Sequence, residues 1–231
     1  MGHAMLQLPR IPELAQRDRF VRRAVLDGRV WTLADEQRAT IKSQKTPGRT
    51  VRLFWSGVSE ARRWAEALSG GGGVKEITLQ SFAADTLPAL LTSNALAGTD
   101  WVAEPIEAEI DPVDLQHRLK TESIAGYLDA LVSGGDVFVV SGDEGPWLES
   151  GAGRAISAPR MSIAAKRADA ERRREALGAK SVIADPITDF LSSTLPWAVH
   201  RGCVVAIEPI TGVGPIDISA SDLATGLKKV T

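Results

Sequence analysis

"TLPALL" (Thr86–Leu91) and "TLPWAV" (Thr194–Val199) share Thr-Leu-Pro at a separation of 194 minus 86, which is 108 positions. The same offset extends without a gap from Leu79 to Leu119 and places apolar residues on apolar residues. The matched pairs include Phe82 with Phe190, Leu96 with Val204, Asp100 with Glu208, Ile110 with Ile218 and Leu115 with Leu223. A repeat that keeps this order over many positions predicts that the chain is an internal duplication.

The duplication also predicts the domain boundary. Upstream the offset changes by one, so that "GRVWTL" from Gly28 falls on "GDVFVV" from Gly135, whereas residues 43–75 match poorly. Two units of 1–120 and 121–231 would each have the size of a common small domain. We therefore expect a first unit followed by a second, diverged one.

Hydrophobic periodicity predicts the same α+β architecture for both units, a mostly antiparallel sheet with helices packed on it. In the first unit we expect a helix closed by Gly28, a hairpin with Asp35-Glu36 near its turn, a strand at 50–55, and a helix opened by Ser56 or Ser59. A strand at 74–79, a helix bent at Pro88, strands at 95–99 and 106–110, and a helix capped by Asp111 follow. In the second unit we expect a strand at 136–140, a helix at 161–178 capped by Ser162 and ended by Gly178, a strand from Cys203, and a last helix opened by Ser219 or Ser221.

Composition excludes several classes of protein. The 231 residues are 44% hydrophobic and 24% charged with a net charge of −2, which gives no bulk attraction to nucleic acid or to an anionic membrane. The sequence has no run of about 18 apolar residues, so no membrane span is expected. "MGHAMLQLPR" lacks the apolar region of a secretory signal, so we expect a cytoplasmic protein. Cys203 is the single cysteine, which rules out disulfides within the chain and a cysteine-rich metal site.

Motifs that carry chemistry are scarce. His3, His117 and His200 lack the spacing of a metal site, so no metal and no cofactor is predicted. Cys203 opens an apolar strand and is interpreted as a buried, inert thiol. Glu104, Glu107, Glu109 and Asp111 are interpreted as a solvated face and a helix cap; the alternative is a site for a divalent cation or a basic partner.

Tryptophans are the most distinctive side chains of the first unit. Trp31 lies in the predicted hairpin, Trp55 ends a strand just before Ser56, and Trp64 lies on the following helix. Large aromatic residues usually fill cores, which is the favoured interpretation. The alternative is an aromatic-walled groove for a peptide or small ligand. Trp31, Trp55, Ser56 and Trp64 are therefore the candidate binding residues.

Parts of both units resemble known domains. "GRVWTL", "LFWSGVSEARRWAEAL", "LPALL" and "IEAEIDPVDLQHRL", within residues 20–119, resemble a small bacterial domain of unknown function. "CVVAIEPITGVGPIDISASDLATGL" in the second unit is similar to the enhanced-serine-sensitivity (SseB-type) domain, with Glu208-Pro209 in place of Asn-Pro. Both resemblances imply an α+β module from the bacterial cytoplasm, and neither brings a catalytic residue.

The function predicted from these patterns is a non-catalytic binding or regulatory module for a protein or peptide partner. Two alternatives stay open. One is a hydrolase or metal-assisted enzyme that uses Glu104, Glu107, Glu109 or Asp111, and the other is a structural module that forms a homodimer.

Overall fold

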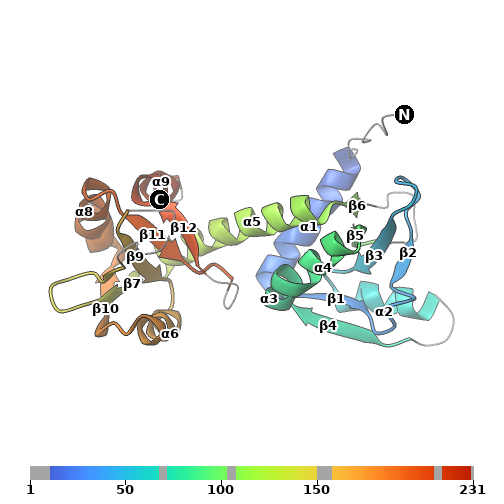
Figure 1. Ribbon diagram of the computed structural model, residues 1–231, viewed down its shortest axis with the longest axis horizontal. Helices are drawn as coiled ribbons and strands as arrows, with labels where there is room; N and C mark the ends of the chain where they lie inside the picture. The colour runs from blue at the N-terminus through green and yellow to red at the C-terminus, as the bar shows by residue number, and fades with distance from the viewer. Residues whose placement is uncertain (1–10, 68–71, 103–107, 150–157, 211–214, 230–231) are drawn as a thin grey trace. The chain divides into compact units, whose positions relative to one another are not determined.

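The chain divides into two compact units, residues 1–122 and 123–231. The computed structural model describes residues 11–67, 72–102, 108–149, 158–210 and 215–229. Each unit is an α+β fold with its own sheet and its own helices (Figure 1). The boundary falls inside the helix α5 (Pro112–Ser133).

In the described part of the first unit, the first and the last elements are helices. Its elements in chain order are α1 (Ile11–Asp27), β1 (Arg29–Leu33), β2 (Thr40–Lys42), β3 (Thr50–Phe54), α2 (Val58–Ala67), β4 (Val74–Thr78), α3 (Leu79–Ser81), the π-helical turn η1 (Phe82–Thr86), α4 (Leu87–Thr92), β5 (Ala95–Thr99), β6 (Glu109–Ile110) and then α5. Gly28 ends α1 with φ of +67°, a left-handed conformation that glycine adopts without strain. This ending is the predicted one.

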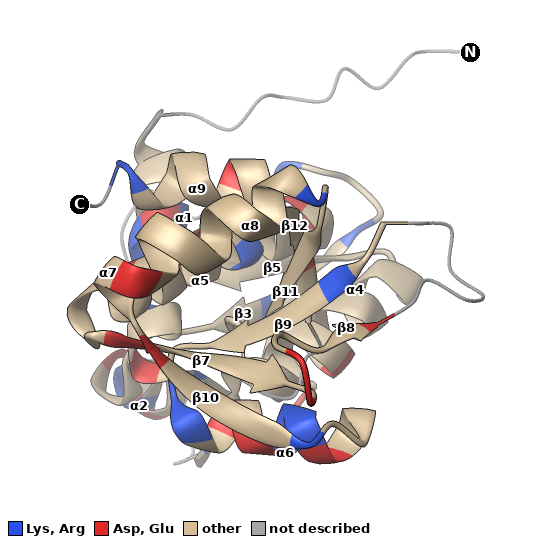
Figure 2. Cartoon of the chain, turned by 90° about the vertical axis from the view of Figure 1, so that its left-hand side faces the viewer, with Lys and Arg blue, Asp and Glu red and all other residues tan. Residues whose placement is uncertain are grey.

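The second unit repeats the order of elements after the last turns of α5. Its elements are β7 (Asp136–Ser141), β8 (Leu148–Glu149), β9 (Arg160–Ala164), α6 (Arg167–Leu177), β10 (Ser181–Pro186), α7 (Ile187–Asp189), the π-helical turn η2 (Phe190–Thr194), α8 (Leu195–His200), β11 (Val204–Ile207), β12 (Ile216–Ser219) and α9 (Ala220–Leu227). In Figures 1 and 2, α8 and α9 lie on one side of the sheet and α6 on the other.

The strand pairings of the two units are the same. In the second unit the order is β10-β7-β9-β11-β12, with β8 paired to β9. In the first unit β4 pairs with β1, β1 bridges to the end of β3 at Trp31 and Trp55, and β3 continues to β5 and β6, with β2 paired to β3. The pairs β3–β5 and β9–β11 are parallel and the other strand pairs are antiparallel. The sheets of the two units therefore have the same topology.

The Thr-Leu-Pro segments fold alike in both units. α3, η1 and α4 recur as α7, η2 and α8 at an offset of 108, because 190 minus 82 is 108. The Leu87 amide donates to the carbonyl of Phe82, and the Leu195 amide donates to that of Phe190, five residues back in each case. Proline follows each leucine and has no amide hydrogen to donate. The bend predicted at Pro88 is therefore a π-helical turn placed just before the proline.

Two local predictions were wrong. β1 and β2 do not form a hairpin, because β1 pairs with β4 while β2 pairs with β3. Asp35 does form a turn and accepts the Gln37 amide at 2.9 Å, but the strands on either side of that turn have separate partners. Ser162 does not cap a helix; it lies in the strand β9, and α6 begins at Arg167.

The missed strand β9 also corrects the repeat. β3 pairs with β5 with Val51 opposite Leu96, and β9 pairs with β11 with Arg160 opposite Val204. Leu96 and Val204 differ by 108, whereas Val51 and Arg160 differ by 109. The counterpart of Phe54-Trp55-Ser56 is therefore Ile163-Ala164-Ala165, a match that the sequences do not show.

A separate apolar core holds each unit together. The core on the α2 side of the first sheet contains Leu33, Val51, Leu53, Trp55, Ala61, Ala65, Leu96 and Trp101. The core of the second unit lies against α5, η2, α8 and α9 and includes Leu131, Val139, Phe190, Val205 and Leu223. Mixed charges lie outside these cores; α6 carries both signs side by side (Figure 2), with pairs such as Arg172 with Asp169 at 2.7 Å.

Candidate functional site

Trp55 lies at the point where β3 ends and α2 is about to begin. Its backbone exchanges two hydrogen bonds of 2.8 Å with the backbone of Trp31, which connects β1 to β3. The Trp55 side chain is fully buried. Its ring centroid lies 6.0 Å from that of Trp64, and Trp64 lies 6.4 Å from Trp101. Three indoles from one strand end, one helix and one loop therefore meet at this end of the sheet.

The indole N–H groups of this cluster are all paired. Trp55 Nε1 donates to the carbonyl oxygen of Trp101 at 2.9 Å, and Trp64 Nε1 donates to the same oxygen at 2.6 Å. Trp101 Nε1 donates to the carbonyl of Ala108 at 2.9 Å. A carbonyl oxygen has two lone pairs and can accept both donors. These bonds fix the rings in place, as a buried indole requires.

Ser56 and Asp100 form a buried pair beside the indoles. The Asp100 carboxylate accepts the backbone amide of Ser56 at 2.7 Å and the Ser56 hydroxyl at 2.9 Å. Burial raises the pKa of Asp100 above its ordinary value, while the Ser56 hydrogen bonds and the charges of Arg19 and Arg23 act in the opposite direction. Asp100 therefore binds the chain immediately before α2, where a negative charge is favourable.

The backbone at Asp100 is unusual as well. Its φ is +49°, a left-handed conformation in which aspartate and asparagine are over-represented. The carbonyl oxygens of Thr99 and Asp100 each accept the Gln16 side-chain amide at 2.7 Å. These contacts stabilise a sharp turn after β5, and this turn places Trp101 in the indole cluster.

The predicted binding residues therefore differ in exposure. Trp55 and Ser56 are buried and contact other residues of the first unit, whereas Trp31 and Trp64 are partly exposed and pack against the same core. Sequence reasoning missed Trp101 and Asp100. The match of Asp100 with Glu208 in the repeat was the available signal, because it places an acidic residue at the same strand end in both units.

The candidate carboxylates have structural partners where they are described. Glu109 accepts the Ser43 hydroxyl and the Gln44 amide. Asp111 accepts the Val113 amide at 2.9 Å, which is the predicted cap of α5. Glu104 and Glu107 lie outside the described residues. Within the described ranges, no three His, Cys, Asp or Glu side chains are grouped as metal ligands.

Cys203 is buried, as predicted, and lies just before β11. Burial raises the pKa of its thiol, with a weaker opposing effect of Arg201. A nucleophilic cysteine requires a thiolate, and this environment disfavours one. His200 is exposed in the last turn of α8, and no hydrogen bond joins it to Cys203 among the described residues.

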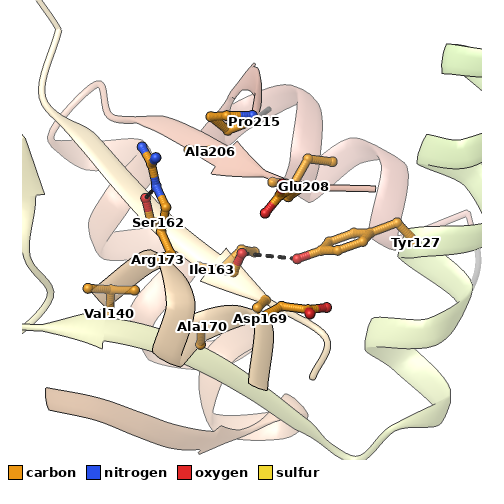
Figure 3. A pocket seen from close by; sticks show the side chains of 12 residues that line it. Tyr127, Val140, Ser162, Ile163, Asp169, Ala170, Arg173, Ala206, Glu208 and Pro215 are labelled. Carbon is orange, nitrogen blue, oxygen red and sulfur yellow. Dashed lines mark hydrogen bonds between the residues drawn. The ribbon is translucent and has the colours of Figure 1, made fainter. Parts of the chain in front are cut away.

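The same strand end in the second unit is open. At the offset of 109, Trp55 and Trp64 correspond to Ala164 and Arg173, and Ala61 corresponds to Ala170, which is buried as Ala61 is. A small pocket with a cavity volume of about 10 Å3 lies there, and part of it is open to solvent. Figure 3 shows Ala170 and Arg173 of α6 on one side and Glu208 and Pro215 on the other. The strand end that three indoles fill in the first unit therefore carries a pocket in the second unit.

The comparisons with known proteins give one family. Residues 17–119, most of the first unit, match the model of the family described as "Protein of unknown function (DUF2750)". No curated protein and no solved structure matches the chain. The resemblance of the second unit to the SseB-type domain stays a prediction. In the part of the chain that the structure describes, no helix has the length and apolar character needed to cross a membrane.

Proposed function

We propose that the first unit is a non-catalytic binding module for a protein or peptide partner, and that Trp31 and Trp64 contact this partner. Trp55 and Ser56 are buried, so they support the contact residues and do not touch the partner themselves. Trp55 holds the β1–β3 junction under Trp31, and Ser56 connects the start of α2 to Asp100. We include in this proposal that the module acts in the bacterial cytoplasm, which rests on the resemblance of residues 20–119.

The partly exposed, fixed indoles are the observation that carries the proposal. The Trp64 indole is held by its hydrogen bond to Trp101, and the Trp31 indole packs against the core on the α2 side of the sheet. A rigid aromatic side chain loses little conformational entropy on binding and provides a large contact area. For this reason tryptophan is enriched among the residues that dominate protein interfaces.

We further propose that the two units arose by internal duplication of one such module. The identical strand pairing and the π-helical turns at an offset of 108 support this. The first copy retains the indole cluster, and the second has Ala164 and Arg173 at the matching positions. The copies would then differ in what they bind while sharing one scaffold.

Affinity capture with the full chain tests the binding proposal. The wild type, the double variant Trp31→Ala/Trp64→Ala and the control Leu26→Ala are immobilised and compared with one bacterial lysate by quantitative mass spectrometry. Leu26 is a suitable control because its side chain is 85% exposed on α1 and lies outside the indole cluster. Circular dichroism establishes that each variant is folded.

We expect a protein that the wild type and Leu26→Ala retain equally and that the double variant loses. The captured protein is then purified and titrated against each variant, with a loss of at least about tenfold in affinity expected for the double variant. Equal retention by all three chains would contradict the proposal. If the captured protein is a second copy of this chain, sedimentation analysis of the same variants identifies a homodimer as the partner.

A further inference from the structure

The strand β10 lies at one border of the second sheet. It is the first strand of the order β10-β7-β9-β11-β12, and it pairs antiparallel with β7, with Ile183 opposite Val139. Figure 2 shows β10 at this border, next to β7. Among the described residues, no strand is paired to the other side of β10. A border strand presents unpaired N–H and C=O groups, which can pair with a strand of another chain.

The register identifies which backbone groups of β10 are unpaired. The Ile187 amide, just after the strand, donates to the Gly135 carbonyl at 2.9 Å. Backbone groups alternate in direction along an antiparallel pair, so the odd-numbered residues of β10 face β7, and Val182, Ala184 and Pro186 face away. Pro186 agrees with this assignment, because proline is tolerated in a border strand where its nitrogen faces away from the neighbouring strand. Val182 and Ala184 therefore each offer one N–H donor and one C=O acceptor.

The side chains at this border are apolar where those of the first unit are charged. β4 is the matching border strand of the first sheet, and Lys75 and Glu76 at its centre are exposed. At the offset of 108 they correspond to Ile183 and Ala184. Ile183 is 48% exposed. Charged side chains are a common protection of border strands against pairing with other chains, and the centre of β10 lacks this protection.

β10 can pair with itself without conflict in one register. With a two-fold axis at Ile183, Val182 of one copy exchanges two hydrogen bonds with Ala184 of the other copy, and the reciprocal pair does the same. The two Ile183 side chains then lie opposite each other in a pair that is not hydrogen-bonded, which is the arrangement that brings opposite side chains closest together. The free donors, the free acceptors and the exposed apolar side chain are all used in this pairing.

The polar side chains near the ends of β10 favour the same register. It places Ser181 of one copy opposite Asp185 of the other, so that a hydroxyl donor meets a carboxylate. Asp185 accepts the Thr194 hydroxyl at 2.6 Å and has lone pairs left for a second donor. A two-fold axis at Asp185 itself would instead place two like charges opposite each other and pair Ala184 with Pro186, which has no N–H.

We propose that β10 is a dimerisation strand, which binds β10 of a second copy of this chain in an antiparallel pair about a two-fold axis at Ile183. The occupant is a second copy because the donors, acceptors and side chains of the strand complement themselves, as a closed two-fold interface requires. One strand pair buries little surface, so we expect a weak dimer. The proposal concerns the second unit and does not rest on the function proposed for the first.

Sedimentation velocity on the full chain over about 1–500 μM tests the proposal, because a weak dimer forms only toward the upper end of this range. Ile183→Lys places two like charges on the axis. Ala184→Pro removes an N–H donor on the free side of β10 and leaves the bonds to β7 in place. Val199→Lys is the matched control, since Val199 is 40% exposed on α8 and lies outside β10. Circular dichroism establishes that each variant is folded.

We expect the wild type to form a dimer and no larger species. Ile183→Lys and Ala184→Pro should each raise the dissociation constant at least about tenfold, because like charges or an unpaired carbonyl would then lie in the strand pair. Val199→Lys should dimerise as the wild type does. The double variant Trp31→Ala/Trp64→Ala should also dimerise normally, which separates this contact from the site proposed in the first unit.

The variant Ile183→Cys tests the position of the axis. Opposite residues of a pair that is not hydrogen-bonded have Cα atoms about 4.5 Å apart, within the range that a disulfide bridges. Oxidised glutathione should therefore convert the Ile183→Cys chain into a covalent dimer, with reduced glutathione released, much faster than it converts the control Val199→Cys. Cys203 is buried and is common to both chains.

A wild type that stays monomeric over the whole range would overturn the proposal. A dimer that Ile183→Lys and Ala184→Pro leave intact would also overturn it, and loss of that dimer only in the double tryptophan variant would place the contact in the first unit. Species that grow beyond the dimer with concentration would indicate pairing of β10 with a different strand, which does not close. Equal rates of disulfide formation in the two cysteine variants would show that the axis does not lie at Ile183.

Discussion

Replacement of Trp55 by alanine should destabilise the first unit far more than replacement of Trp31. The Trp55 side chain is fully buried, and its truncation removes a whole indole from the core together with the hydrogen bond to the Trp101 carbonyl. Truncation of a buried Trp costs about 3–5 kcal/mol in free energy of unfolding. Trp31 is partly exposed, so Trp31→Ala should cost roughly half as much. A domain of this size has a total stability of about 5–15 kcal/mol, so both effects are measurable.

Urea unfolding of the full chain, followed by far-UV circular dichroism, measures both costs. Trp55→Phe is the matched control, since it keeps an aromatic ring and removes the N–H donor. The loss should be smaller than that of Trp55→Ala, about 1–3 kcal/mol, because the variant removes one hydrogen bond and leaves a smaller cavity, while Trp64 still donates to the Trp101 carbonyl. If the units unfold in separate transitions, only the transition of the first unit should move. A cost below about 1 kcal/mol for Trp55→Ala, or a larger cost for Trp31→Ala, would refute the assignment of Trp55 to the core.

Three further outcomes are expected. Burial raises the pKa of Asp100 above 3.8, so the folded state binds this proton more tightly than the unfolded state. The free energy of unfolding of the wild type should therefore fall as pH rises through that raised pKa, and this pH dependence should be absent in Asp100→Asn. The same slope of stability against pH in both chains between pH 4 and 7, measured by urea titration, would contradict a raised pKa for Asp100. Gly98→Ala should lower the melting temperature at a cost of about 1–3 kcal/mol, because its Cβ would lie 2.7 Å from Leu53 and 2.9 Å from Val51, and a calorimetric scan with no shift would oppose this. Cys203 should react with iodoacetamide much more slowly in the native chain than in urea, since its thiol is buried and its pKa is raised; equal rates by mass spectrometry would show it to be accessible.

The sequence predicted the elements that depend on local signals. Gly28 and Gly178 end helices with left-handed conformations, and Asp111 caps α5, because each of these endings is determined by a few neighbouring residues. The hairpin prediction failed for the opposite reason. Asp35 does make a turn, but whether the strand before it pairs with β2 or with β4 depends on residues about 45 positions away. Turn chemistry carries no information about that choice.

The site was predictable only in part, for a similar reason. Trp55 was identified from the strand that it ends, but its burial depends on Trp101, which follows β5 and closes over it. Alternation along a strand assigns a side chain to a face of the sheet, and it does not say which loop covers that face. The pocket of the second unit was missed because Ala164 was placed in a helix, so that its correspondence with Trp55 could not be drawn.

Under the proposed duplication, a comparison of the two units indicates which part of this scaffold tolerates change. The Thr-Leu-Pro segment keeps its π-helical turn in both units, and the phenylalanine that opens each turn, Phe82 or Phe190, is fully buried. Phe82 packs edge-on against Phe54 at 4.9 Å, beneath the sheet. A change there would alter the packing of β3 and β5 together, so the fold constrains it. At the strand ends the side chains meet a helix start and loops, where an indole can be exchanged for alanine without altering the strand pairing. If the two units bind different partners, as proposed, the difference should therefore be sought at Trp55, Trp64 and their counterparts, and not in the repeated segment.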